Sequence, residues 1–222
     1  MKVNFPHGFH RWGFDKMRIV KEPEVRKNEI LDAAERIFAA KGYEAATVID
    51  VLEAVKIAKG TFYYYFKSKE DVLDAIIERR ISEGVKRAEE IAASPLPPMQ
   101  KLLAIIMAQK PQNQVQEDFT SVLHEKDNAK LHQKSLTQYV LRLSPCLGKV
   151  IEEGIEAGVF STSFPKESAE IFYTVALVLF DDDYFKWTKE EAAAKIAAFL
   201  TAAERTVGAE AGSFLEFAKA FG

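Results

Sequence analysis

The sequence contains a single cysteine among 222 residues, Cys146, which rules out an internal disulfide framework and fits a reducing compartment. It lacks any long apolar run: the longest, residues 171–180, has ten residues, where a membrane-spanning helix needs roughly 20. Its first twenty residues contain no continuous apolar stretch, so no signal peptide is expected. With 48% hydrophobic and 28% charged residues, the chain is predicted to be a soluble, cytoplasmic protein without a membrane partner.

The sequence also lacks the alternation of apolar and polar residues that marks a half-buried strand, whereas helical spacing recurs throughout. Ile30, Ala34 and Phe38 start one such apolar stripe. Several helix starts are marked by capping pairs or by proline: Thr47 with Asp50, Ser68 with Asp71, Thr188 with Glu191, and Pro165. Residues 129–157 are expected to form one long helix, or two interrupted at Pro145. The predicted fold is all-α, with about nine or ten helices.

No nucleophile–base arrangement, metal-binding motif or phosphate-binding loop is present, so we expect neither an enzyme nor a cofactor. His124 and His132 invite a metal interpretation. On one continuous helix, however, their eight-residue separation would place them ~12 Å apart, too far to share an ion. We therefore expect no metal site. Asp181, Asp182 and Asp183 are expected to be a solvated helix end, with a site for a cation or a cationic effector as the alternative.

Charge is unevenly distributed along the chain. Residues 1–80 carry 15 Lys and Arg against 13 Asp and Glu, a net of +2, whereas the remaining 142 carry 15 against 20, a net of −5. Within residues 56–69 there are four lysines and no acidic residue. A concentrated basic patch on an acidic protein indicates a local anion site.

The segment "KGTFYYYFKSKE", residues 59–70, combines that basic patch with aromatic residues. Successive helical residues are ~100° apart, so three consecutive tyrosines cannot all face a core. Phe62 and Phe66, spaced i, i+4, are expected to define the buried side. The outward side then offers amine, hydroxyl and bare backbone, which suits an anionic, hydrogen-bond-accepting partner.

Two short helices, at about 48–54 and 59–65, are joined by a turn of about four residues and flanked by longer helices. This is a helix-turn-helix arrangement, whose second helix enters the major groove of double-stranded DNA. Lys59 can reach a guanine edge or a phosphate, Thr61 can contact either, and Gly60 permits close backbone approach. The hydroxyl groups of Tyr63, Tyr64 and Tyr65 can donate to phosphate oxygens. Thr47 and Lys69 lie at helix starts, where an anion is favoured.

Residues 30–77, "ILDAAERIFAAKGYEAATVIDVLEAVKIAKGTFYYYFKSKEDVLDAII", resemble the DNA-binding domain of TetR-type (TetR/AcrR) transcriptional regulators. The resemblance implies a dimeric regulator, with a repressor preferred over an activator, released from its operator by a small-molecule effector. It places Lys59, Gly60, Thr61, Tyr63 and Tyr65 on base- or backbone-contacting positions. It places Thr47, Tyr64 and Lys69 on phosphate-contacting ones.

The implied domains are an arm over residues 1–22, a three-helix DNA-binding domain over 23–83 with its helix-turn-helix at about 47–66, and a C-terminal effector-binding and dimerisation domain over 84–222. The arm is expected to be flexible, either of little consequence or lying along nucleic acid. The homodimer is expected to form through about residues 165–206. The effector pocket is expected among the helices between about 99 and 180, with the following candidates: Phe119, Leu123, His124, Tyr139, Arg142, Phe172 and Tyr173.

The chain departs from the family pattern at two places. Val55 and Lys56 replace the usual Ala-Gly, so Lys56 either adopts a left-handed conformation at ~1 kcal/mol or the turn differs in shape. Ala58 replaces the usual serine N-cap, a loss of ~1 kcal/mol. These departures keep open a protein that has lost operator recognition and acts as an effector-binding or adaptor protein. An all-α enzyme is a further alternative.

Overall fold

The computed structural model describes residues 22–124, 128–181 and 184–215, and within these ranges it contains nine α-helices and no strand. The all-α prediction is therefore confirmed. The predicted arm lies outside the described residues, apart from Glu22. Among the residues that are described, no helix is both long and apolar enough to cross a membrane.

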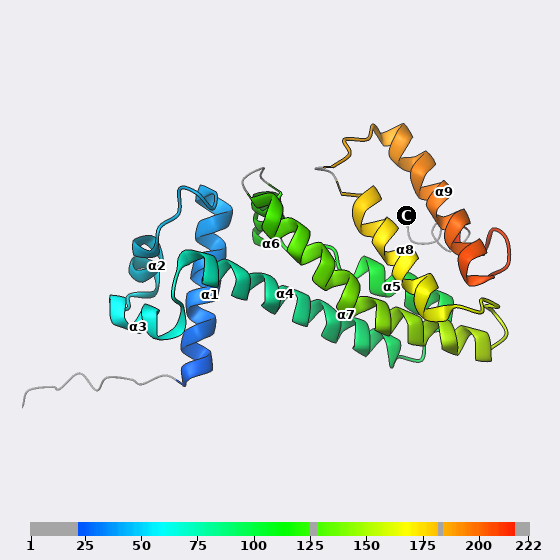
Figure 1. Ribbon diagram of the computed structural model, residues 1–222, viewed down its shortest axis with the longest axis horizontal. Helices are drawn as coiled ribbons and strands as arrows, with labels where there is room; N and C mark the ends of the chain where they lie inside the picture. The colour runs from blue at the N-terminus through cyan, green and yellow to red at the C-terminus, as the bar shows by residue number, and fades with distance from the viewer. Residues whose placement is uncertain (1–21, 125–127, 182–183, 216–222) are drawn as a thin grey trace, which may run out of the picture.

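The N-terminal part consists of α1 (Pro23–Lys41), α2 (Val48–Val55) and α3 (Lys59–Tyr65), packed on the first half of α4 (Lys69–Ala92). Figure 1 shows α1, α2 and α3 gathered at one end of the molecule, with α4 running from them into the C-terminal part. Because α4 is continuous from 69 to 92, the predicted domain division at residues 83 and 84 falls inside a single helix.

The C-terminal part is a helical layer built around α7, the longest helix of the described chain. Its elements are α5 (Pro98–Met107), α6 (Gln114–Leu123), α7 (Ala129–Glu156), α8 (Pro165–Leu179) and α9 (Lys189–Val207). Helix α7 continues through Pro145, so the one-helix alternative is correct. Figure 1 shows α8 and α9 at the end of the molecule far from α1–α3.

The helix boundaries follow the capping signals in the sequence. The hydroxyl oxygens of Thr47, Ser68 and Thr188 each accept a hydrogen bond from the backbone N–H three residues later. Each cap satisfies one of the N–H groups that a helix start leaves without a partner. Pro165 begins α8 as predicted.

Helix α6 packs into the core of the N-terminal part, although it belongs to the C-terminal part by sequence. Phe119, Val122 and Leu123 lie in the same buried cluster as Phe38 of α1 and Ile76 of α4. A second cluster joins the far end of α4 to α5, α7, α8 and α9. Helices α4 and α6 therefore both connect the helix-turn-helix to the rest of the molecule.

A buried carboxylate on α1 fastens α4 in this arrangement. Glu35 Oε2 accepts from Arg79 Nη2 at 2.8 Å, and Oε1 accepts from Arg80 Nε at 2.7 Å. The Glu35 side chain is only 11% exposed, so these bonds are protected from water. Arg80 also lies 4.3 Å from the ring centroid of Phe119, which brings α6 into the same junction.

Glu35→Gln is expected to lower the free energy of unfolding by about 2–4 kcal/mol, because two arginines would lose their buried charged partner. Urea denaturation followed by circular dichroism measures this change. Asp32→Asn is the matched control, since Asp32 is 53% exposed and pairs with Arg79 alone. It should cost less than about 1 kcal/mol. Equal effects of the two substitutions would contradict the role given to Glu35.

Candidate nucleic-acid interface and cavity

Helix α3 presents the two faces that the sequence predicts. Phe62 and Phe66 are 0% and 4% exposed and belong to the N-terminal core, whereas Tyr63 and Tyr64 are 46% and 77% exposed. Lys59 is exposed, and its ammonium group lies 5.7 Å from the centroid of the Tyr63 ring. The prediction that the phenylalanines are hidden is confirmed, and Lys59, Tyr63 and Tyr64 face outward as expected, whereas Tyr65 does so only in part.

The other predicted members of this face are less accessible. Thr61 and Tyr65 are half-buried, and Tyr65 packs against the core cluster of the N-terminal part. The rings of Tyr64 and Tyr65 meet edge to face, with centroids 4.9 Å apart. Tyr65 thus supports the exposed Tyr64 ring from the core side.

Gly60 is exposed in the first turn of α3, and a Cβ atom built there would meet nothing within 4 Å. Packing of this chain therefore does not require a glycine. A glycine in a helix costs about 0.5–1 kcal/mol relative to alanine. Its presence at this exposed position is explained if a partner must approach the backbone closely.

The turn before α3 contains the only non-glycine residue with a positive φ among the described residues. Lys56 adopts a left-handed conformation, with φ 56° and ψ 50°. The first of the two predicted alternatives is therefore correct. The N–H of Ile57 donates to the carbonyl of Leu52 at 3.1 Å, which closes the C-terminus of α2. Ala58, at the N-cap of α3, makes no side-chain cap, as its methyl group requires.

Helix α2 is held at its start by a complete capping box. Thr47 Oγ1 accepts from the Asp50 N–H at 3.2 Å, and Asp50 Oδ2 accepts from both the Thr47 N–H and its hydroxyl at 2.8 Å. Hydrogen bonds from Lys41 and then from Thr47 lower the pKa of Asp50 from 3.8 to about 2. The charged cap is therefore fully present above the ordinary carboxyl pKa and is lost as the pH falls through about 2.

Lys69 makes internal bonds that the sequence did not reveal. Its ammonium group donates to the carbonyl oxygens of Tyr43 at 2.7 Å and Ala46 at 3.1 Å, with Glu44 at 3.4 Å. It also lies 4.1 Å from the centroid of the Tyr43 ring. An ammonium group has three donors. In this structure Lys69 donates to carbonyl oxygens of the loop between α1 and α2, so it fixes that loop and orients α2.

A cavity of about 520 Å³ opens among α4, α6, α7 and α8. Four of the residues predicted for an effector pocket line it: Leu123, His124, Tyr139 and Tyr173. Burial raises the pKa of both tyrosines, so they remain neutral hydroxyl groups at ordinary pH.

Three other pocket candidates lie elsewhere. Phe119 is fully buried beneath Arg80, and Phe172 stacks on Phe199 in the C-terminal core. Arg142 pairs with Glu78 on α4 at 2.5 Å. Periodicity alone cannot distinguish an apolar residue that lines a cavity from one that fills a core. Phe119 and Phe172 were therefore predicted for the pocket although they belong to the core.

Two arginines of the cavity wall were missed at the sequence level. Arg80 and Arg87 lie on α4, which precedes the region of about residues 99–180 where the pocket was expected. Arg87 Nε donates to the carbonyl of Ala108 at 3.2 Å, which holds its guanidinium group beside the cavity. The cavity is therefore apolar in part, with Arg80, Arg87 and the carboxylate of Glu83 on the α4 side.

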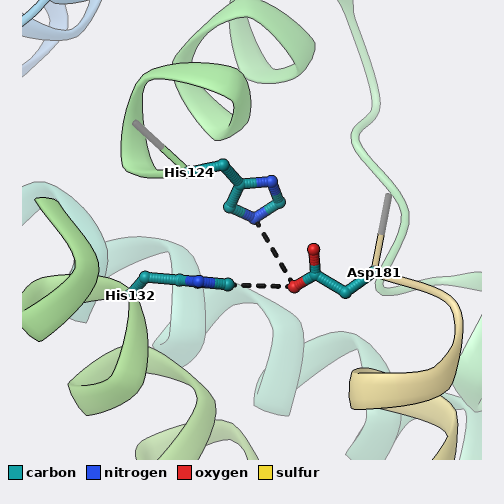
Figure 2. Close-up of side chains that lie close together, drawn as sticks. All are labelled: His124, His132 and Asp181. Carbon is teal, nitrogen blue, oxygen red and sulfur yellow. Dashed lines mark ion pairs between the residues drawn. The ribbon is translucent and has the colours of Figure 1, made fainter. Parts of the chain in front are cut away.

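His124, His132 and Asp181 converge from three separate elements, as Figure 2 shows. Asp181 Oδ2 lies 3.1 Å from His132 Nε2 and 3.9 Å from His124 Nε2. The argument that the histidines are ~12 Å apart was wrong, because it assumed one continuous helix. Helix α6 ends at Leu123 and α7 begins at Ala129, so His124 and His132 do not lie on one helix. The expectation of a solvated Asp181 was also wrong, since its side chain is 4% exposed.

The outer face of α8 is apolar and uncovered. Ile171, Val175 and Val178 follow the i, i+4, i+7 spacing of one helix face and are 58%, 42% and 38% exposed. Ile196 of α9 adds a fourth exposed apolar side chain at 45%. Exposed apolar side chains that share one helix face are a feature of interaction sites on folded proteins.

Comparison with known proteins agrees with this architecture. A family model described as "Bacterial regulatory proteins, tetR family" matches residues 30–76, and one described as "Tetracyclin repressor-like, C-terminal domain" matches residues 111–202. The HTH-type transcriptional regulator YhgD of Bacillus subtilis (strain 168) is 27% identical over 169 residues, which cover 74% of this chain and 85% of YhgD.

Other relatives match over shorter segments or by fold. The HTH-type transcriptional repressor KstR2 of Mycolicibacterium smegmatis is 31% identical over 87 residues, 39% of this chain, so the chain matches only 42% of that relative's length. The solved structure of RolR in complex with resorcinol shares the fold, with a TM-score of 0.56, 18% identity, and coverage of 87% of this chain and 92% of RolR. The two family matches together span more than half of the sequence, and the chain belongs to the TetR family of DNA-binding transcriptional regulators.

Proposed function

We propose that this regulator is a ligand-responsive repressor that binds a double-stranded DNA operator through α3 and is released when a small molecule enters the cavity. The observation that carries this proposal is the position of the cavity. Its walls include α4 and α6, and both helices also pack into the core that supports the helix-turn-helix. A ligand that displaces either helix changes the position of α3.

We assign DNA contact to the exposed face of α3 and its surroundings. Lys59, Gly60 and Thr61 would contact base edges or backbone at the start of the helix, with Tyr63, Tyr64 and Tyr65 beside them. Lys56 and Lys67 are also exposed and add positive charge to the same end of the molecule. Thr47 would contribute through the exposed start of α2. Lys69 would act indirectly, because its ammonium group holds the loop before α2.

The chemistry of the cavity favours a small, largely apolar effector with one anionic or hydroxyl group. Ile77, Leu123 and Leu177 supply apolar wall, while Arg80 and Arg87 supply hydrogen-bond donors. A volume of about 520 Å³ lies within the range of small-molecule sites. RolR, which shares this fold, binds resorcinol, a small ring with hydroxyl groups. Binding rather than catalysis would transmit the signal, in the cytoplasm where the operator lies.

We further propose that the functional unit is a homodimer formed through the apolar face of α8 and α9, within the predicted residues 165–206. Figure 1 places these helices at the end of the molecule far from α3. Two copies joined there would leave both α3 helices free. A helix-turn-helix dimer reads two half-sites about 34–36 Å apart.

Gly60→Ala is expected to separate stability from DNA binding. The added methyl group meets no neighbour, so the melting temperature should rise or remain unchanged. Affinity for an operator selected from a random DNA pool should fall at least tenfold, because the methyl group would lie between the backbone and the DNA. Fluorescence anisotropy measures the affinity. Unchanged affinity would contradict the assignment of this face.

Lys59→Ala tests the same proposal through electrostatics. Loss of one phosphate-directed cation should lower the slope of log affinity against log salt by about 0.9. Lys86→Ala is the matched control, since Lys86 is 77% exposed on α4 but distant in sequence from the helix-turn-helix. A slope that changes equally in both variants would show a general charge effect.

Leu177→Trp is expected to fill part of the cavity. The variant should retain operator binding but need at least tenfold more of an effector isolated from a metabolite extract for release from DNA. Val159→Trp, at an exposed residue outside the cavity lining, is the control. If Leu177→Trp does not fold, Tyr139→Phe removes only a hydroxyl group from the wall. A normal response in the folded variants would place the effector elsewhere.

Val175→Arg is expected to convert a dimer into a monomer at micromolar concentration, because it buries a charge in the proposed interface. Sedimentation equilibrium measures the mass of each variant. Val159→Arg is the control, since Val159 is 43% exposed and lies outside α8 and α9. A monomeric wild-type protein would refute the proposed dimer.

A further inference from the structure

We propose that His124, His132 and Asp181 form a binding site for a divalent transition metal ion of the zinc class, with its open position facing the effector cavity. Two imidazoles and one carboxylate are a ligand set that such ions favour, whereas Mg²⁺ and Ca²⁺ favour oxygen ligands alone. The site would deepen the proposed function by adding a Lewis acid to the cavity wall, and in that respect it depends on that function.

The ligand atoms already lie near the separations that a metal requires. One ligand atom from each residue can be chosen so that all three lie within 4.8 Å of one another. The two measured Nε2-to-Oδ2 separations are 3.1 and 3.9 Å. Ligands at about 2.0–2.1 Å from a tetrahedral zinc ion are about 3.3 Å apart. Side-chain movements of less than about 1 Å would therefore suffice.

The surroundings hold the ligands in place. Asn128 is buried, and its Nδ2 donates to the carbonyl of Val122 at 2.7 Å, which fixes the end of α6 against the start of α7. Tyr184 stacks on the His132 ring at a centroid distance of 5.5 Å. Ordered ligands of this kind reduce the entropy lost when a metal binds.

The cluster is largely buried. The side chains of His132 and Asp181 are 7% and 4% exposed, and that of His124 is 18% exposed. A buried carboxylate requires compensation by a cation or by hydrogen bonds. A metal ion would supply that charge to all three residues at once. Ion pairing of Asp181 with the histidines, without a metal, is the rival explanation that the experiment must exclude.

Three protein ligands leave at least one position for another donor. All three residues line the 520 Å³ cavity, as do Tyr139 and Arg87. An effector with an oxygen or nitrogen donor could therefore bind the ion directly. The site would also join α6, which packs in the core of the helix-turn-helix, to α7 and α8. Metal occupancy would thus restrict the same helix that an effector must move.

The test is a titration of the full chain with ZnCl₂ by isothermal calorimetry after removal of metals with EDTA and desalting. One equivalent per chain is expected for the wild type. Asp181→Asn and His132→Gln should each weaken binding more than tenfold. Glu117→Gln, an exposed carboxylate on α6, should bind as the wild type does. Excess Mg²⁺ should not displace the zinc ion.

Two further measurements keep the result interpretable. Circular dichroism of the metal-free variants must show the wild-type helix content, so that lost binding reports lost ligands. Co²⁺ bound in place of Zn²⁺ should give visible absorption that Asp181→Asn abolishes. Absence of stoichiometric Zn²⁺ binding, retention of it in folded Asp181→Asn, or displacement by Mg²⁺ would overturn the proposal. Operator binding is measured separately, so its absence would refute the proposed function and not the metal site.

Discussion

The guanidinium group of Arg80 connects the parts of this molecule that must communicate. It is bonded to Glu35 on α1, lies over the Phe119 ring of α6 and lines the cavity. Removal of the charged partner of a largely buried guanidinium is costly, so the pair with Glu35 favours one relative arrangement of α1 and α4, and the contact with Phe119 adds α6 to it. The cavity and the helix-turn-helix therefore share an electrostatic junction, and α3 packs on the same core.

The surface that we propose to face DNA contains several local departures from ideal helix chemistry. Lys56 adopts a left-handed conformation, Ala58 provides no N-cap and Gly60 weakens an exposed helix turn. Each is unfavourable for the isolated fold by the measures of helix propensity and capping. Of the three, only Gly60 has a structural explanation, because the absence of a side chain leaves the backbone at the start of α3 open to a partner. Two interactions offset these unfavourable contributions. Phe62 and Phe66 anchor α3 in the core, and the hydrogen bonds of Lys69 hold the loop before α2.

Local signals in the sequence predicted the fold and the orientation of α3 well. The i, i+4 pair Phe62 and Phe66 decides which way the tyrosines face, and capping pairs mark helix starts, because both depend on residues close in sequence. The His124, His132 and Asp181 cluster was not predictable in this way. Its members come from the end of α6, from α7 and from the end of α8, and only the tertiary packing of these helices brings them together. The hydrogen bonds of Lys69 were likewise not predictable, because its three acceptors are backbone carbonyl oxygens, which every residue type has.

The place of α6 in the first core has a consequence for protein engineering. A fragment ending near residue 83 would lack Phe119, Val122 and Leu123, and so would expose the apolar surface of α1 and α4 that they cover. Burial of one phenylalanine alone is worth up to about 3 kcal/mol. The hydrophobic core beneath the helix-turn-helix is thus completed by α6, which belongs to the C-terminal part by sequence. A chimera that joins residues 22–83 to the C-terminal part of another protein would need an α6 that fits the apolar surface of α1 and α4. Otherwise the contacts among these three helices would have to be redesigned.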